Sequence, residues 1–137
     1  MLTHLLDTSV YSQRLRPRPN EEVVRRWSMA GDARLAISAL CEAELLFGLE
    51  KKGSARLWRE YEAYLKHKLI VLPLDRKVIE THAQIKAERM AAGITIGEFD
   101  LLIGATAIVH QLKLATLNTK DFRKLPQLEV EDWSLAK

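Results

Sequence analysis

Residues 96–118 have the sequence IGEFDLLIGATAIVHQLKLATLN, in which an apolar helical segment directly precedes a short apolar strand. From Phe99 to Val109 the apolar side chains recur at helical spacing, and KLATLN has the length of a buried strand. The helix nevertheless opens with a carboxylate, Asp100. An acid in a first turn either offsets the helix dipole and caps the helix or faces a functional site, and this segment alone leaves both explanations open.

The same alternation of short apolar strands and helices runs along the whole chain. Strands are predicted at residues 4–6, 34–38, 69–74, 113–118 and 128–132. Between them, helices are predicted at residues 21–30, 39–52, 55–68, 76–92 and 99–109, the first four of them opened or capped by Asn20, Ser38, Ser54 and Asp75. This pattern is typical of βαβ units. It predicts a three-layer α/β domain in which helices cover both faces of a parallel sheet of about five strands.

Length and composition indicate an ordinary globular protein. The 137 residues are expected to form a single domain, residues 1–137, with a substantial core. No apolar run approaches the ~20 residues of a membrane span, and the N-terminal segment lacks the features of a signal peptide, so we expect a cytoplasmic protein. Cys41 is the only cysteine, which excludes an internal disulfide and a multi-cysteine zinc site. We expect Cys41 to be a small core residue.

The basic residues gather in three places along a chain whose formal net charge is only +3. The clusters are Arg14, Arg16 and Arg18; Arg25 and Arg26; and Lys120, Arg123 and Lys124. Such clusters are usually solvated surface, but they would also suit a polyanion. We take Arg14, Arg16, Lys120 and Arg123 as the candidate contacts to such a ligand.

Acidic residues follow the predicted strands or open the following helices. Asp7 comes directly after the first strand, Glu44 lies in the helix after the second, Asp100 opens its own helix and Asp121 follows the fourth strand. In a parallel α/β sheet the ligand site lies outside the carboxyl ends of the strands. Each acid alone could be a cap, but together they are predicted to gather at that edge of the sheet.

A cluster of carboxylates opposes folding unless a cation or a proton relieves it. Two carboxylates 4 Å apart repel by roughly 4 kcal/mol at an effective dielectric of 20. With oxygen ligands only, and with four scattered histidines, the expected cation is hard, either Mg²⁺ or Mn²⁺. Such a cation polarises a phosphoryl oxygen and activates water. The chain has no Gly-rich nucleotide-binding loop, so a phosphodiester substrate fits best, and the basic clusters would contact it.

Four sequence blocks resemble the PIN-domain ribonucleases, specifically the VapC-type toxins of bacterial toxin–antitoxin pairs. The blocks are LLDTSV, ISALCEAELLFGLEK, IGEFDLLIGATAI and LATLNTKDFRKLPQLEVEDW, and they keep the order and spacing of that family nearly end to end. The resemblance implies a three-layer PIN-like fold with an acidic pocket that binds Mg²⁺ or Mn²⁺. It also implies an endoribonuclease that hydrolyses RNA phosphodiester bonds.

The resemblance assigns roles to individual acids. Asp7 and Asp100 would bind the metal ion directly, and Glu44 would help to position the attacking water. Glu42 competes with Glu44 for this role, but it lies two helix positions away and so points to a different side of the helix. Gly48 completes the family motif that begins with Glu44.

The fourth acid and the supporting residues are less determined by the motifs. Asp121 is our choice for the fourth catalytic residue, with Asn118 helping, although relatives carry acids or amides at either place. Ser9 is a candidate to hydrogen-bond a metal ligand or the substrate, with a turn residue as the alternative. Thr116 either orients an acid or packs in the core. Gly104 is expected to allow close packing.

The resemblance further implies partners: an RNA substrate, a VapB-type antitoxin that neutralises the toxin, and a second copy of the chain in a homodimer. An antitoxin arginine can reach the acids in many such complexes, because a guanidinium can take the place of a cation. Trp58, Tyr61, Tyr64 and Leu65 would either line a partner groove or belong to the core.

Other readings remain at this point. A haloacid-dehalogenase-type phosphatase would need an acid where Ser9 stands, and a phosphoacceptor receiver domain would need paired acids near the first strand, where Asp7 stands alone. From a different functional class, the fold could serve as a catalytically silent RNA- or protein-binding module. Degenerate modules usually lack one of the acids, whereas Asp7, Glu44 and Asp100 are all present.

Overall fold

A five-stranded parallel sheet forms the centre of the computed structural model, which describes residues 1–136; residue 137, the last of the expected domain, lies outside the described residues. The strand order is β3-β2-β1-β4-β5, so β1 is the central strand and β3 and β5 form the edges. The strands are β1 (His4–Leu6), β2 (Leu35–Ser38), β3 (Ile70–Leu72), β4 (Lys113–Thr116) and β5 (Val130–Asp132). The predicted fold class is therefore confirmed.

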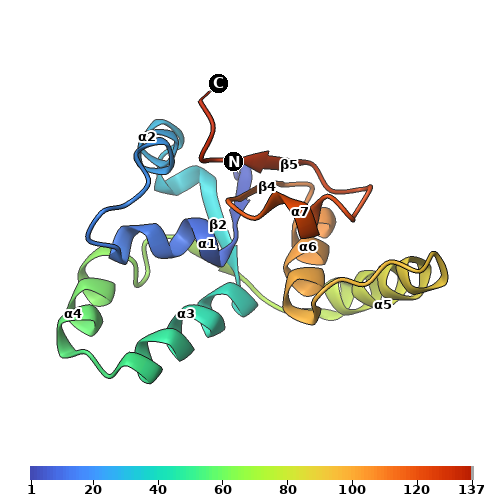
Figure 1. Ribbon diagram of the computed structural model, residues 1–137, viewed down its shortest axis with the longest axis horizontal. Helices are drawn as coiled ribbons and strands as arrows, with labels where there is room; N and C mark the ends of the chain where they lie inside the picture. Colours follow the sequence, from blue (N-terminus) through green and yellow to red (C-terminus); the bar gives the residue numbers. More distant parts are fainter. Residues whose placement is uncertain (137) are drawn as a thin grey trace.

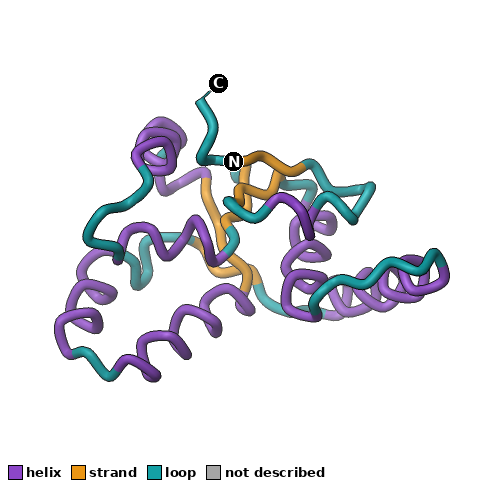
Figure 2. The backbone as a smooth tube through the Cα atoms, in the orientation of Figure 1, coloured by secondary structure: helices purple, strands orange, loops and turns teal. Residues whose placement is uncertain are grey.

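Seven α-helices surround the sheet within the described part of the chain (Figure 1). They are α1 (Thr8–Tyr11), α2 (Glu21–Ala30), α3 (Ala39–Lys52), α4 (Ala55–Tyr64), α5 (Arg76–Ala91), α6 (Glu98–His110) and α7 (Thr119–Phe122). Two short 3₁₀ segments, Ser12–Leu15 and Asp32–Arg34, follow α1 and α2. In Figures 1 and 2 the helices α1 to α4 lie on one side of the sheet and α5 and α6 on the other.

Two hydrophobic cores fill the two faces of the sheet. Alternate residues of a strand point to opposite faces, so Leu6 of β1 packs with α1 to α4 while Leu5 packs with α5, α6 and α7. Cys41 is fully buried in the first core, as expected from its sequence context. The strands β1, β2 and β4 lie between the two cores, so most of their residues are buried on both faces of the sheet. Their sequences are therefore largely apolar instead of alternating.

The predicted helix starts agree with the observed ones because their caps are encoded locally. The side chains of Asn20, Ser38, Ser54 and Asp75 each accept a hydrogen bond from the backbone N–H three residues later. Gly31 follows α2 with a φ of 81°. These interactions fix where each helix begins relative to the strand before it.

The helix predicted at residues 55–68 is shorter than expected, because α4 ends at Tyr64. The backbone N–H groups of Leu65 and Lys66 both donate to the carbonyl of Tyr61, at 2.9 and 2.8 Å. His67 then adopts a φ of 63°, which no helix can continue. Leu65 turns into the core, and the chain can therefore enter β3.

Two short helices were not predicted. Each follows directly from the carboxyl end of a strand, α1 after β1 and α7 after β4. A helix of four residues is too short to produce a hydrophobic period, so the sequence pattern does not reveal it. Both helices lie next to acids of the candidate site.

Candidate functional site

Asp7 occupies the central position at the carboxyl edge of the sheet. It directly follows β1, and its backbone N–H donates to the carbonyl of Ala115 in β4 at 3.1 Å. Only 5% of the residue is exposed. Its Oδ1 accepts a hydrogen bond from the N–H of Val10 at 3.1 Å and so caps α1. The strand order reverses at β1, which has β2 on one side and β4 on the other, and ligands of open α/β sheets bind at such a switch point.

Two hydroxyl groups hold the carboxylate of Asp7. Ser9 Oγ donates to Oδ1 at 2.6 Å, and Thr116 Oγ1 donates to Oδ2 at 2.5 Å. Each hydroxyl oxygen in turn accepts a backbone N–H, from Leu117 at 3.0 Å and from Asn118 at 2.8 Å. Because the backbone donors occupy the hydroxyl oxygens, their protons point to Asp7. Ser9 and Thr116 therefore orient Asp7 in this structure.

Burial raises the pKa of Asp7, and the hydrogen bonds from Ser9, Thr116 and Val10 lower it without cancelling this effect. Desolvation penalises the charged form of a carboxyl group, whereas donors stabilise it. The protein thus keeps a carboxylate in a place that disfavours its charge, which is typical of functional sites.

Glu44 lies in the second turn of α3, and its Oε1 accepts a hydrogen bond from Thr8 Oγ1 at 2.5 Å. Glu42 points elsewhere: the Tyr11 hydroxyl lies 3.4 Å from each of its carboxylate oxygens. Burial raises the pKa of Glu42. The two candidates therefore face different neighbours, with Glu44 on the side of α3 that faces Thr8 and the acidic edge.

Asp100 is not the N-cap residue of α6. The N-cap of α6 is Gly97, which makes no side-chain capping bond. Burial and, after it, the charges of Asp121, Glu44 and Asp7 in that order together raise the pKa of Asp100 to about 6. Carboxylates from α7, α3 and the end of β1 thus act on one carboxyl group at the start of α6. The four acids that the sequence selected therefore interact electrostatically at the start of α6.

Asp121 lies in α7 and forms an ion pair with Lys124 at 3.2 Å. Asn118 precedes α7, with an exposed side chain, and its backbone N–H holds Thr116. Of these two residues, Asp121 is the one whose charge acts on Asp100.

The described side chains do not form a ready cation site. Among residues 1–136, no three His, Cys, Asp or Glu side chains stand together closely enough to hold a metal ion. Instead three of the four carboxylates have a local partner: Ser9 and Thr116 for Asp7, Thr8 for Glu44 and Lys124 for Asp121. These partners reduce the repulsion between the acids. The donor set consists of carboxylate oxygens, which suit Mg²⁺ or Mn²⁺, and the raised pKa of Asp100 is the electrostatic deficit that such a cation would relieve. In the chemistry of their donors, though not in the spacing of these side chains, the residues therefore fit a hard cation.

The four candidate polyanion contacts differ in their surroundings. Arg14 donates to Asp32 at 3.0 Å, and its guanidinium lies 3.9 Å from the centre of the Trp27 ring. These contacts engage Arg14 within the protein. Arg16, Lys120 and Arg123 are exposed, and Lys120 and Arg123 flank Asp121 along the chain. The two residues around α7 are therefore better placed for a ligand at the acids than Arg14 is.

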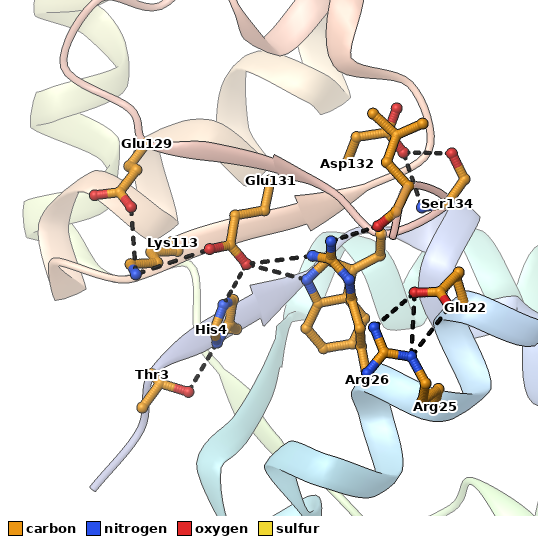
Figure 3. Close-up of polar contacts among 12 residues, drawn as sticks. Thr3, His4, Glu22, Arg25, Arg26, Lys113, Glu129, Glu131, Asp132 and Ser134 are labelled. Atoms are coloured by element: carbon orange, nitrogen blue, oxygen red, sulfur yellow. Dashed lines mark hydrogen bonds and ion pairs between the residues drawn. The ribbon is translucent and has the colours of Figure 1, made fainter. Parts of the chain in front are cut away.

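A second polar cluster lies at the opposite edge of the sheet (Figure 3). Glu131 of β5 accepts from His4 at 2.8 Å and from the indole of Trp133 at 3.2 Å, and it lies 3.9 Å from the guanidinium of Arg26. A cavity of about 990 Å³ adjoins this cluster and is lined by none of the four acids. The charged groups here pair with one another and join β1, α2 and β5, which is a structural arrangement.

One residue of the site was missed by the sequence analysis. Thr8, the donor to Glu44, was not selected, although it stands between Asp7 and Ser9 in the quoted block LLDTSV. Only its position beside two selected residues could have indicated it. A threonine side chain has no sequence signature for a partner 36 residues away.

The fold and the acidic edge together define an α/β domain of the nuclease type, and comparison with known proteins agrees. The PIN domain model matches residues 4–128, and the chain is 34% identical over 129 residues to Ribonuclease VapC1 of Rickettsia felis, covering 92% of each protein. It is 29% identical over 134 residues to the tRNA(fMet)-specific endonuclease VapC of Salmonella typhimurium, covering 97% of this chain and 99% of that one. This chain belongs to the PIN-domain family, within its VapC-type ribonucleases.

A solved structure agrees with this assignment. The crystal structure of DNA-bound VapBC from Salmonella typhimurium contains a chain that matches with a TM-score of 0.84 and 29% identity, over 97% of this chain and 99% of that one. The sequence predicted a nuclease, and the relatives found by the comparison are ribonucleases and endonucleases. Separately, no helix within residues 1–136 is both long and apolar enough to cross a membrane.

Proposed function

We propose that this protein is an endoribonuclease toxin that uses Mg²⁺ or Mn²⁺ to hydrolyse RNA phosphodiester bonds and that a VapB-type antitoxin neutralises it. The observation that carries the proposal is the effect of three carboxylates, Asp121, Glu44 and Asp7, on the carboxyl group of Asp100. Three carboxylates that oppose the ionisation of a fourth at the carboxyl edge of a parallel sheet carry a cost that a bound cation would offset, which supports a metal-dependent function.

Asp7 and Asp100 would hold the cation directly: burial raises the pKa of each, and a bound cation would stabilise the charged form. When bound, the cation supplies polarisation of a phosphoryl oxygen and activation of water. The hydroxyls of Ser9 and Thr116 keep both oxygens of Asp7 in one orientation, so this ligand is preorganised.

Glu44 and Asp121 orient the attacking water and accept its proton. They reach the acidic edge from α3 and α7, and neither is buried as deeply as Asp7. Since water is the nucleophile, the RNA 2′-hydroxyl takes no chemical part. Lys120 and Arg123 beside Asp121 neutralise substrate phosphates, and Arg16 extends this contact.

The antitoxin acts on the same acids. A guanidinium from the partner would satisfy the carboxylates in place of the cation, because it offers a delocalised charge and several donors. The VapBC complex from Salmonella typhimurium supports a partner of this type.

We also propose a homodimer. Its surface would include the edge strand β3, where Ile70 and Val71 are 53% and 44% exposed.

The direct test is cleavage of total cellular RNA by purified, antitoxin-free protein. The reaction is run with Mg²⁺, with excess chelator, and with the Asp100→Asn variant. We expect discrete fragments only from the wild type with Mg²⁺, and a loss of rate of at least about 100-fold in the variant, because one of the two direct ligands has lost its charge. Mapping the fragment ends identifies the RNA.

The matched control is Glu98→Gln, which removes a carboxylate two residues earlier on α6. Glu98 pairs with Lys86 and His82 instead of with the acids of the site. Equal cleavage by wild type and Asp100→Asn would show a contaminant and contradict the proposal. RNA binding without any cleavage, independent of metal, would instead identify a binding module.

A further inference from the structure

Thr8 joins two parts of the acidic edge that are far apart in the sequence. It is the first residue of α1, directly after Asp7, and its Oγ1 lies 2.5 Å from Oε1 of Glu44 in α3. We infer that Thr8 is a positioning residue, which holds Glu44 toward Asp7 and thereby supports cation binding at the acids. The inference rests on the proposed function and names a residue that acts through Glu44.

The hydroxyl of Thr8 is the donor in this contact. An ionised carboxylate can only accept, so the proton lies on Thr8. A distance of 2.5 Å is at the short end for a hydroxyl donating to a charged oxygen, which marks a strong, charge-assisted bond. One oxygen of Glu44 is therefore held, and rotation of this flexible side chain is restricted.

The two residues that follow Asp7 each hold one acid of the site. Thr8 donates to Glu44, and Ser9 donates to Asp7. Because α1 is capped by Asp7, a single short helix sets the position of Asp7 relative to Glu44. A loss of the Thr8 hydroxyl would leave Asp7 in place and release Glu44 alone.

The test measures Mn²⁺ binding by the full chain, with electron paramagnetic resonance of free Mn²⁺ as the readout. Thr8→Val removes the hydroxyl and keeps the shape of the side chain. We expect Mn²⁺ to bind about tenfold more weakly to this variant, the size of effect seen when a residue that orients a ligand is lost. Thr8→Ser, which restores a hydroxyl, should bind Mn²⁺ like the wild type. Thermal unfolding in chelator checks the fold.

The matched control is Thr3→Val. The Thr3 hydroxyl donates to the carbonyl of Arg34 at the opposite edge of the sheet, so its loss should leave Mn²⁺ binding unchanged. If Thr8→Val does not fold, Thr8→Ala replaces it with the same expected weakening. Wild-type Mn²⁺ affinity in a folded Thr8→Val or Thr8→Ala variant would overturn the inference.

A double-mutant comparison shows whether Thr8 acts through Glu44. In a Glu44→Gln background, adding Thr8→Val should weaken Mn²⁺ binding little further, because the group that it orients has already changed. If Thr8→Val weakens Mn²⁺ binding by the same factor in the Glu44→Gln background as in the wild type, the two residues act independently. This result would overturn the inference and leave the role of Glu44 intact. An unchanged Mn²⁺ affinity in Glu44→Gln alone would overturn the inference but not the proposed function, in which Glu44 orients the attacking water and is tested by RNA cleavage.

Discussion

The ionisation of the Asp100 carboxyl group depends on burial and on three neighbouring carboxylates. Burial and the charges of Asp121, Glu44 and Asp7 raise its pKa to about 6, from 3.8 for an isolated aspartate. A group with a raised pKa in the folded state favours folding while it is protonated. Its stabilising contribution is therefore complete below the unfolded pKa and is lost as the pH rises through the folded value.

This sign gives a pH-dependent prediction for the metal-free protein. Asp100→Asn removes the charge, so at pH 8 the variant should unfold at a temperature a few degrees higher than the wild type. The difference should shrink progressively as the pH falls from 6 toward 4, because the wild-type carboxyl group becomes protonated. Thermal unfolding in chelator across this range measures the effect.

Glu98→Gln is the control for this prediction. Glu98 forms ion pairs with Lys86 and His82, and hydrogen bonds from these residues lower its pKa. Its replacement should therefore give no gain of stability at pH 8. A pH-independent difference between Asp100→Asn and wild type would contradict the assigned cause.

At the scale of elements, α6 must approach the segment that follows α7 closely enough to bring Asp100 and Asp121 together. Gly104 of α6 permits this approach: a β-carbon built there would lie 2.5 Å from Leu125 Cδ1 and 3.6 Å from Leu128 Cδ2. The close packing expected of Gly104 is thus confirmed. Leu125 is itself buried, so it has little room to move away.

Two glycine substitutions separate helix propensity from packing. Alanine gains up to about 1 kcal/mol over glycine inside a helix. At Gly48 of α3 a β-carbon meets nothing within 4 Å, so Gly48→Ala should stabilise the protein by about this amount. At Gly104 the gain is opposed by overpacking of roughly 1–3 kcal/mol, so Gly104→Ala should be destabilising.

Urea unfolding of the two variants and the wild type measures these changes. Gly48→Ala acts as the internal reference, because both substitutions add the same methyl group to a helix. Equal stabilisation by both variants would show that Leu125 relaxes without cost. The packing role of Gly104 would then be wrong.

At the scale of the whole molecule, elements from both sides of the sheet supply the acids. Glu44 comes from α3, on the side of the first core, while Asp100 comes from α6, on the side of the second. Asp7 lies between them at the end of β1, and Asp121 follows β4. A ligand that binds all of these acids therefore links the two layers of helices through the sheet, and its binding adds to the stability of the entire fold.

Mg²⁺ should consequently raise the midpoint of thermal unfolding. At a concentration ten times the dissociation constant, binding contributes about 1.4 kcal/mol, which corresponds to ~5 °C for a chain of this size. The measurement compares MgCl₂ with KCl at equal ionic strength. Asp100→Asn should lose most of the shift, and an equal shift in that variant would place the cation elsewhere.

Much of the fold could be predicted from the sequence because its signals are local. The first four strands lie in short, largely apolar runs, and the caps Asn20, Ser38, Ser54 and Asp75 bond within their own helices. The parallel sheet follows from the alternation of these elements. The choice of Asp7, Glu44, Asp100 and Asp121 followed from their positions after strands and at helix starts, together with the family motifs.

Long-range contacts were accessible only through the tertiary structure. The end of α4 depends on burial of Leu65, the engagement of Arg14 depends on Trp27 and Asp32, and the role of Thr8 depends on a glutamate 36 residues away. The raised pKa of Asp100 likewise sums charges from three other elements. The sequence by itself determined the strands and the longer helices, because hydrophobic period and capping act over a few residues, and it selected the candidate acids. Only the tertiary structure decided which partner each polar side chain meets, because that depends on how distant elements pack.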